Sequence, residues 1–96
     1  MKILKENNTA IIIPDGDIVG DAVVMLQTKL NEAVENVSII EINMENVNYA
    51  VSSFVPLIEE IHKKLSEKGG KLVLKNCNDR IKDLFHTIST IDIKIK

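Results

Sequence analysis

This sequence has few residues that could form disulfides or aromatic contacts, and it has no large excess of charge of either sign. Its single cysteine, Cys77, cannot form an internal disulfide. Twelve basic residues stand against fourteen acidic ones, and the aromatic residues are Tyr49, Phe54 and Phe85. This composition excludes the basic surface and the stacking platform of a typical nucleic-acid-binding protein.

Long apolar segments are also absent. No run approaches the roughly 20 apolar residues that span a membrane, and the charged start, residues 1–6, lacks the apolar stretch of a signal peptide. We therefore expect a cytoplasmic protein that does not insert into a membrane. With 45% hydrophobic and 27% charged residues, the 96-residue chain suffices for one packed core. We expect a single domain over residues 1–96.

Apolar runs bounded by turn residues predict the strands. The run before Pro14 is continuous and β-branched, which is typical of a buried strand, and the last residues alternate with period two, as in an edge strand. Pro14 to Asp17 predict a turn. The expected strands cover residues 9–14, 37–42, 71–74 and 92–96, with a further short edge strand in residues 1–6.

Helical periodicity predicts three helices between these strands. The first begins at Asp21, a candidate N-cap, and the second ends at Lys68-Gly69-Gly70, a typical stop signal. Their apolar faces comprise Val23, Leu26, Leu30, Ala33 and Val34; Phe54, Ile58, Ile61 and Leu65; and Ile81, Leu84, Phe85 and Ile88. The alternation predicts an α/β fold: a mixed, largely parallel sheet of four to five strands with about three helices packed against it.

Residues that could carry catalysis do not cluster. Glu59 and His62 have a spacing found in metal sites, but no second such pair completes a ligand set. Cys77 has no basic residue next to it in sequence to activate its thiol. Nothing assembles a nucleophile, a base and oxyanion donors. We expect a protein that is not an enzyme and that has no metal site and no cofactor.

The pair Ser52-Ser53 stands where a loop meets the second helix. If Ser52 were the N-cap, its carbonyl would await the N–H of Pro56, which proline lacks. Ser53 is therefore the better cap, and the Ser52 hydroxyl lies just outside the helix. A phosphate on Ser52 would add about −1.5 to −2 charges at the positive end of the helix dipole. The position suits a switch that acts on partner binding.

The order of these motifs resembles a STAS domain, the type found in bacterial anti-sigma factor antagonists and in some transporter subunits. The resemblance covers nearly the whole chain and rests on the motifs Val47-Asn48-Tyr49-Ala50-Val51-Ser52-Ser53, Gly69-Gly70, Lys71-Leu72-Val73-Leu74 and Ile81 to Ile88. It implies that Ser52 matches the serine phosphorylated by a partner kinase, which is itself the anti-sigma factor. It also implies that the unmodified domain binds this kinase and releases the sigma factor, and so regulates transcription.

Three positions depart from the family pattern. Val51 stands in place of Asp before the phosphorylated serine, Phe54 in place of Gly after the second serine, and Val19 in place of Asp in the first loop. These changes make the predicted surface more apolar and less anionic. The sequence is therefore compatible with two alternatives: partner binding that is switched by phosphorylation of Ser52, and partner binding that does not involve phosphorylation. Phe54 has two alternatives: it packs into the core as the first apolar residue of its helix, or it protrudes as an anchor for a partner.

We expect binding of a protein partner of the anti-sigma factor and serine kinase type. The predicted contact residues are Asp17, Val19, Val51, Ser52, Ser53 and Phe54. Two alternatives are an accessory subunit that docks on the ATPase of a membrane (lipid) ABC transport complex and a small-molecule or nucleotide sensor. The family commonly has a further helix after its last strand, whereas this sequence ends at Lys96. An apolar patch left open there would allow self-association into a homodimer.

Overall fold

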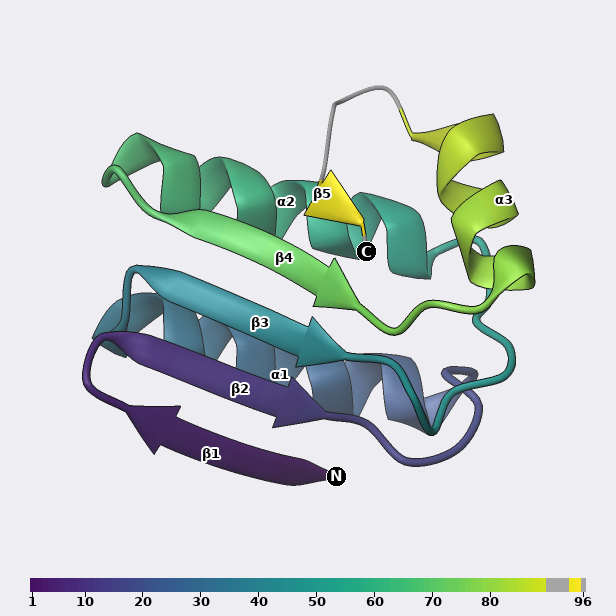
Figure 1. Cartoon of the computed structure of the whole chain (residues 1–96), viewed down its shortest axis with the longest axis horizontal. Helices are drawn as coiled ribbons and strands as arrows, with labels where there is room; N and C mark the ends of the chain where they lie inside the picture. Colours follow the sequence, from purple (N-terminus) through teal and green to yellow (C-terminus); the bar gives the residue numbers. More distant parts are fainter. Residues whose placement is uncertain (90–93, 96) are drawn as a thin grey trace.

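The fold is built on a mixed sheet of five strands in the order β1-β2-β3-β4-β5 (Figure 1). It was obtained as a computed structural model, which describes residues 1–89, 94 and 95. The elements are β1 (Lys2–Glu6), β2 (Thr9–Ile13), α1 (Asp21–Asn36), β3 (Ile39–Asn43), α2 (Phe54–Glu67), β4 (Lys71–Lys75), α3 (Asp79–Ile88) and β5 (Lys94–Ile95). The predicted fold class is confirmed. Of the predicted last strand, Lys94 and Ile95 form β5, and the other residues lie outside the described ones.

Every strand pairs with its neighbour in sequence. β1 runs antiparallel to β2, and β2, β3, β4 and β5 are parallel. Connections between neighbouring parallel strands are right-handed. When every connection adds the next strand on the same side of the growing sheet, their helices lie on the same face. Figure 1 accordingly shows α1 behind β2 and β3, and α2 behind the β4 side. In the part of the chain that the structure describes, no helix covers the opposite face of the sheet (Figure 1).

The two faces of the sheet differ in composition because side chains alternate along each strand. On the helix side, the central strands contribute buried apolar residues: Ala10, Ile12, Ile40, Ile42, Leu72 and Leu74. On the open side, neighbouring residues such as Ile11 and Ile39 stay partly exposed. Glu41 and Lys75 form an ion pair of 2.8 Å across β3 and β4 on this open side.

Two helix boundaries differ from the prediction, and a third agrees with it. Asp21 is the first residue of α1, and the N-cap is Gly20, because the backbone there has a φ of 52° that favours glycine. Val37 ends α1 instead of beginning β3, since its N–H donates to the Ala33 carbonyl. Ser53 does occupy the N-cap position of α2, as predicted.

The predicted stop at Gly69-Gly70 is confirmed, and each glycine has its own cause. Gly69 has a φ of 76°, the left-handed conformation that commonly ends a helix. Gly70 lies against the start of β3: a Cβ there would stand 1.9 Å from the Ser38 carbonyl oxygen. The Lys71 N–H donates to the same oxygen at 2.9 Å, so β4 can begin only where α2 comes this close to β3.

Candidate functional site

Three loops follow the carboxyl ends of β2, β3 and β4 and lead into the three described helices. They comprise residues 14–20, 44–53 and 76–78, and together we call them the loop surface. Parallel strands bring these ends to one edge of the sheet, the right-hand end in Figure 1. In open α/β sheets, this edge is where binding sites commonly form.

The first two loops are joined by backbone hydrogen bonds. The Ile18 N–H donates to the Tyr49 carbonyl at 2.9 Å, and the Val51 N–H donates to the Ile18 carbonyl at 3.0 Å. They form a parallel bridge between Ile18 and Ala50, whose side chains are both buried. The backbone around Ile18 therefore runs beside residues 49–51, which directly precede Ser52.

The third loop is attached through the side chain of Asn78. Its Nδ2 donates to the carbonyls of Val47 at 3.4 Å and Asn48 at 3.0 Å. Its Oδ1 accepts from the Ile81 N–H at 2.9 Å and so caps α3. One side chain thus begins a helix and supports the loop that precedes Ser52.

Both serines of the predicted motif are exposed, and neither hydroxyl makes a hydrogen bond to another described residue. Ser53 has a helical backbone, with φ −65° and ψ −14°, so its hydroxyl does not cap the helix as expected. The N–H groups of Phe54 and Val55 donate to the carbonyls of Val51 and Ser52 at 3.0 and 3.1 Å. The helix dipole would therefore stabilise a phosphate on Ser52. The N–H groups of Phe54 and Val55 would not donate to it, because they are already hydrogen-bonded.

The other predicted contact residues divide into two groups. Asp17 and Val19 are exposed and flank the bridge residue Ile18, and Val51 is half-buried beside it. Phe54, by contrast, is fully buried and packs edge-to-face on Phe85, with 5.7 Å between the ring centroids. The core alternative therefore holds for Phe54, and its side chain is removed from the candidate surface.

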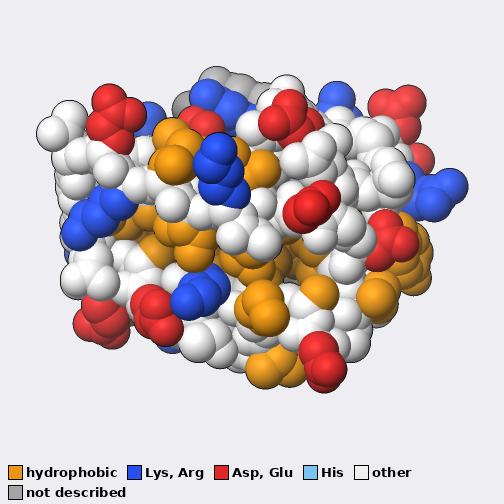
Figure 2. All heavy atoms as spheres, turned by 90° about the horizontal axis from the view of Figure 1, so that it is seen from below, with side chains coloured by type: hydrophobic (Ala, Val, Ile, Leu, Met, Phe, Trp, Pro, Cys, Tyr) orange, Lys and Arg blue, Asp and Glu red, His pale blue; other side chains and the backbone are white. Residues whose placement is uncertain are grey.

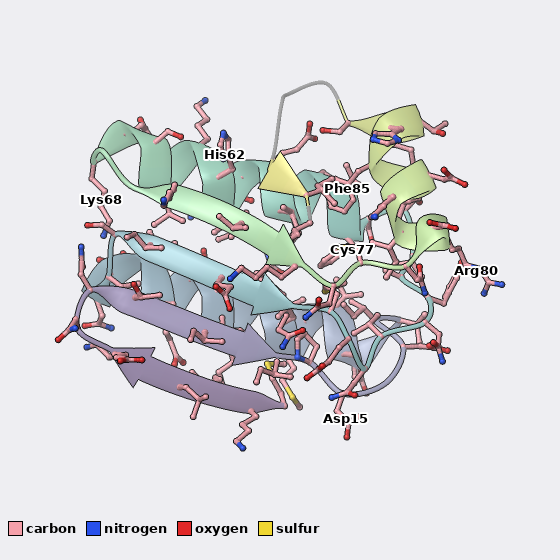
Figure 3. The ribbon with its side chains drawn as sticks, viewed as in Figure 1. Asp15, His62, Lys68, Cys77, Arg80 and Phe85 are labelled. Carbon is pink, nitrogen blue, oxygen red and sulfur yellow. The ribbon has the colours of Figure 1, made fainter. Side chains whose placement is uncertain are left out.

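The other side chains considered for catalysis or metal binding lie away from Ser52 or are buried. Burial raises the pKa of Cys77 from 9.0 to about 11, partly offset by Lys82, so the thiol stays protonated near neutral pH. The described residues contain no group of three or more His, Cys, Asp or Glu side chains that could hold a metal ion. Figure 3 shows Cys77 and Phe85 directed inward, whereas Asp15 and Arg80 point outward from the molecule.

A polar depression opens beside the contact of Asn78 with the second loop. It is lined by Asn48, Asn78, Asp79, Arg80 and Asp83. Two carboxylates against one guanidinium disfavour a phosphate group there. No described helix is both long and apolar enough to cross a membrane.

The STAS domain family model matches residues 1–94, and the chain belongs to this family. This confirms the resemblance inferred from the sequence. The loop surface therefore belongs to a STAS domain. None of the curated proteins compared matches the chain.

Solved structures with the same fold include anti-sigma factor antagonists. The chain is 20% identical to SpoIIAA in its unphosphorylated form, with a TM-score of 0.82, covering 99% of this chain and 86% of that one. For the phosphorylated form of SpoIIAA, a Bacillus cell fate determinant, the values are 21%, 0.76, 92% and 82%. A Thermotoga maritima protein provisionally assigned as an anti-sigma factor antagonist gives 16%, 0.84, 98% and 83%.

A transporter domain also shares the fold. The STAS domain of a SulP transporter from Vibrio cholerae is 14% identical, with a TM-score of 0.62, over 88% of this chain and 66% of that one. At such identities the similarity shows the fold alone.

Proposed function

We propose that this STAS domain is a non-enzymatic, cytoplasmic regulatory protein of the anti-sigma factor antagonist type, which binds a partner protein through the loop surface. The observation that carries the proposal is the position of Ser52. Its hydroxyl is exposed, makes no hydrogen bond within the described chain, and lies one residue before the N-cap of α2. SpoIIAA, which shares the fold, has been solved with and without phosphate.

Phosphorylation of Ser52 is the proposed switch. The modification would add about −1.5 to −2 charges to a surface that now presents the half-buried Val51 and the exposed Val19. The helix dipole favours the added charge, so the domain can stay folded. A partner seated over Val19 and Val51 would have to desolvate the phosphate, and binding would weaken.

The first test asks whether Ser52 carries phosphate in the native cell. We expect mass spectrometry of the purified protein to find one phosphate on Ser52 in the wild type and in Ser53→Ala, and none in Ser52→Ala. Ser53 is the matched control because it is the adjacent serine and is also exposed. Phosphate on Ser53, or on neither serine, would contradict the switch.

A second test measures the binding itself. Ser52→Asp should weaken binding of the partner kinase by at least about fivefold, or about 1 kcal/mol, because a charge enters the interface. Titration calorimetry of the purified pair measures the affinity, and Val24→Asp on the exposed side of α1 is the control for added charge. Equal affinity of Ser52→Asp and wild type would remove Ser52 from the interface.

An accessory subunit of a membrane (lipid) ABC transport complex is the second candidate. It is favoured by Val19, which is 40% exposed, and by Val51, because an apolar docking face needs no acid beside the serine. In that case Ser52 carries no phosphate, and Val19→Asp abolishes docking on the transporter ATPase while Ser52→Asp has a smaller effect. The polar depression does not favour the third alternative, a small-molecule or nucleotide sensor, because two carboxylates and one guanidinium line it and disfavour a phosphate group there.

A further inference from the structure

The outer edge of β1 is an exposed strand edge with no described neighbour. β1 pairs with β2 on one side, and no other described strand reaches its second side. All five of its residues are exposed, including Ile3 at 42% and Leu4 at 45%. The pairing with β2 is regular from Lys2 to Glu6, and β1 contains no proline. Such an edge is a template for another strand.

The hairpin turn determines which backbone groups of β1 face outward. A two-residue turn at Asn7-Asn8, with Asn7 at a φ of 55°, makes Glu6 and Thr9 the last hydrogen-bonded pair of the hairpin. Because antiparallel pairing alternates, Leu4 and Lys2 also direct their N–H and C=O groups to β2. The backbone groups of Ile3 and Lys5 therefore point to the free edge.

We propose that β1 pairs antiparallel with β1 of a second copy of this chain, about a two-fold axis at Leu4. The sequence Lys2-Ile3-Leu4-Lys5-Glu6 is complementary to itself in this arrangement. Lys2 lies opposite Glu6 of the second copy, Ile3 opposite its Lys5, and the two Leu4 side chains face each other. The outward groups of Ile3 and Lys5 form the hydrogen-bonded pairs.

The side chains fit the same register. In the proposed pairing of the two β1 strands, Leu4 and Lys2 fall at non-hydrogen-bonded positions, where opposite Cα atoms are only about 4.5 Å apart. This is a close distance for a Lys2–Glu6 ion pair and for a Leu4–Leu4 contact. Leu4 also lies opposite Ile11 on the open face of the sheet, so the contact joins an existing apolar stripe. Figure 2, which looks onto the β1 edge, shows hydrophobic side chains gathered along the middle of this view.

The charge pattern favours a second copy over an unrelated strand, because one copy supplies both the lysine and the glutamate that the other needs. Lys5 has no acidic partner in this register, and a single strand pair buries little area, so we expect a weak dimer with a dissociation constant in the micromolar range or above. The two-fold axis sends the two loop surfaces to opposite ends of the dimer. Both remain open, and this inference is independent of the proposed function.

Sedimentation velocity over a concentration series tests the dimer. The wild type should shift from monomer to dimer as its concentration rises into the hundreds of micromolar. Leu4→Lys should stay monomeric, because it places two ammonium groups face to face at the axis. The matched control is Val24→Lys on α1, 61% exposed, which should dimerise like the wild type. A wild type that is monomeric throughout, or a Leu4→Lys variant that still dimerises, would overturn the proposal.

A charge exchange tests the register itself. Glu6→Lys should weaken dimerisation about tenfold, because the symmetric dimer loses two ion pairs at once. Adding Lys2→Glu to that variant should restore the wild-type affinity, since both pairs return with their signs exchanged. Circular dichroism checks that each variant is folded. Failure of the double variant to recover would exclude this pairing, even if the wild type dimerises.

Discussion

Cys77 lies between β4 and α3, and only 8% of its surface is exposed. Burial removes water from the thiolate, and the pKa of the thiol rises from 9.0 to about 11. The sequence indicated a thiol without an activating neighbour, and the structure adds burial as the stronger reason for its low reactivity. The same residue therefore links pH to stability.

Alkaline pH should lower the folding stability of the protein through Cys77. As pH rises from 9 toward 11, an unfolded chain loses the Cys77 proton before the folded chain does, so folding stability falls across this window. Cys77→Ala removes this contribution and should lose less stability over the same interval. Urea unfolding at both pH values measures the difference. Identical losses for the two proteins would show that the thiol is not the cause.

Ser52 and Phe54 show what local sequence rules can decide. Pro56 lacks an N–H, and this fact alone placed Ser53 at the N-cap and Ser52 outside the helix. The sequence left Phe54 open between core and surface, because an apolar residue at a helix start can turn either way. Its burial depends on Phe85, 31 residues further along, which no local rule can place.

At the scale of elements, the junction of α2 with β4 depends on Gly70. Gly70→Ala should destabilise the protein by at least about 3 kcal/mol, because the new Cβ would overlap the Ser38 backbone, which cannot move without shifting β3. Gly69→Ala is the control: it has open space and pays only for its positive φ, about 1 kcal/mol. Chemical denaturation measures both. Equal costs would mean that the close approach to β3 is not what requires Gly70.

Periodicity predicted the elements well and their ends less well. The apolar faces of α1, α2 and α3 follow a 3.6-residue repeat that burial requires, so the sequence carries that signal strongly. The ends depend on single backbone angles. Gly20, not Asp21, is the N-cap of α1, and Val37 is its C-cap although its β-branched side chain suits a strand.

At the scale of the whole molecule, the loop surface depends on contacts between loops far apart in sequence. The Ile18–Ala50 bridge and the bonds from Asn78 join residues about thirty positions apart. The alternation of strands and helices predicted a largely parallel sheet, and parallel strands bring these loops to one edge. It could not predict which backbone groups meet there, since that depends on the three-dimensional path of each loop.

Asn78 allows these contacts to be tested separately from helix capping. Asn78→Asp keeps the oxygen that caps α3 but loses the Nδ2 donor to the second loop. We expect amide exchange in residues 47–53 to accelerate in this variant, while exchange in α3 stays near wild type. Asn78→Ala loses both and should cost about 1–2 kcal/mol of stability. Unchanged amide exchange in residues 47–53 of Asn78→Asp would mean that the second loop keeps its conformation without the hydrogen bonds from Asn78.

The strand order has a consequence for how the chain can be synthesised. Since each strand joins the one made just before it, no segment has to be inserted between two that are already paired. A nascent chain leaving the ribosome can close the β1–β2 hairpin and then add one helix and one strand at a time to a growing border. Loop closure stays short at each step, which favours rapid assembly and leaves little time for misfolding.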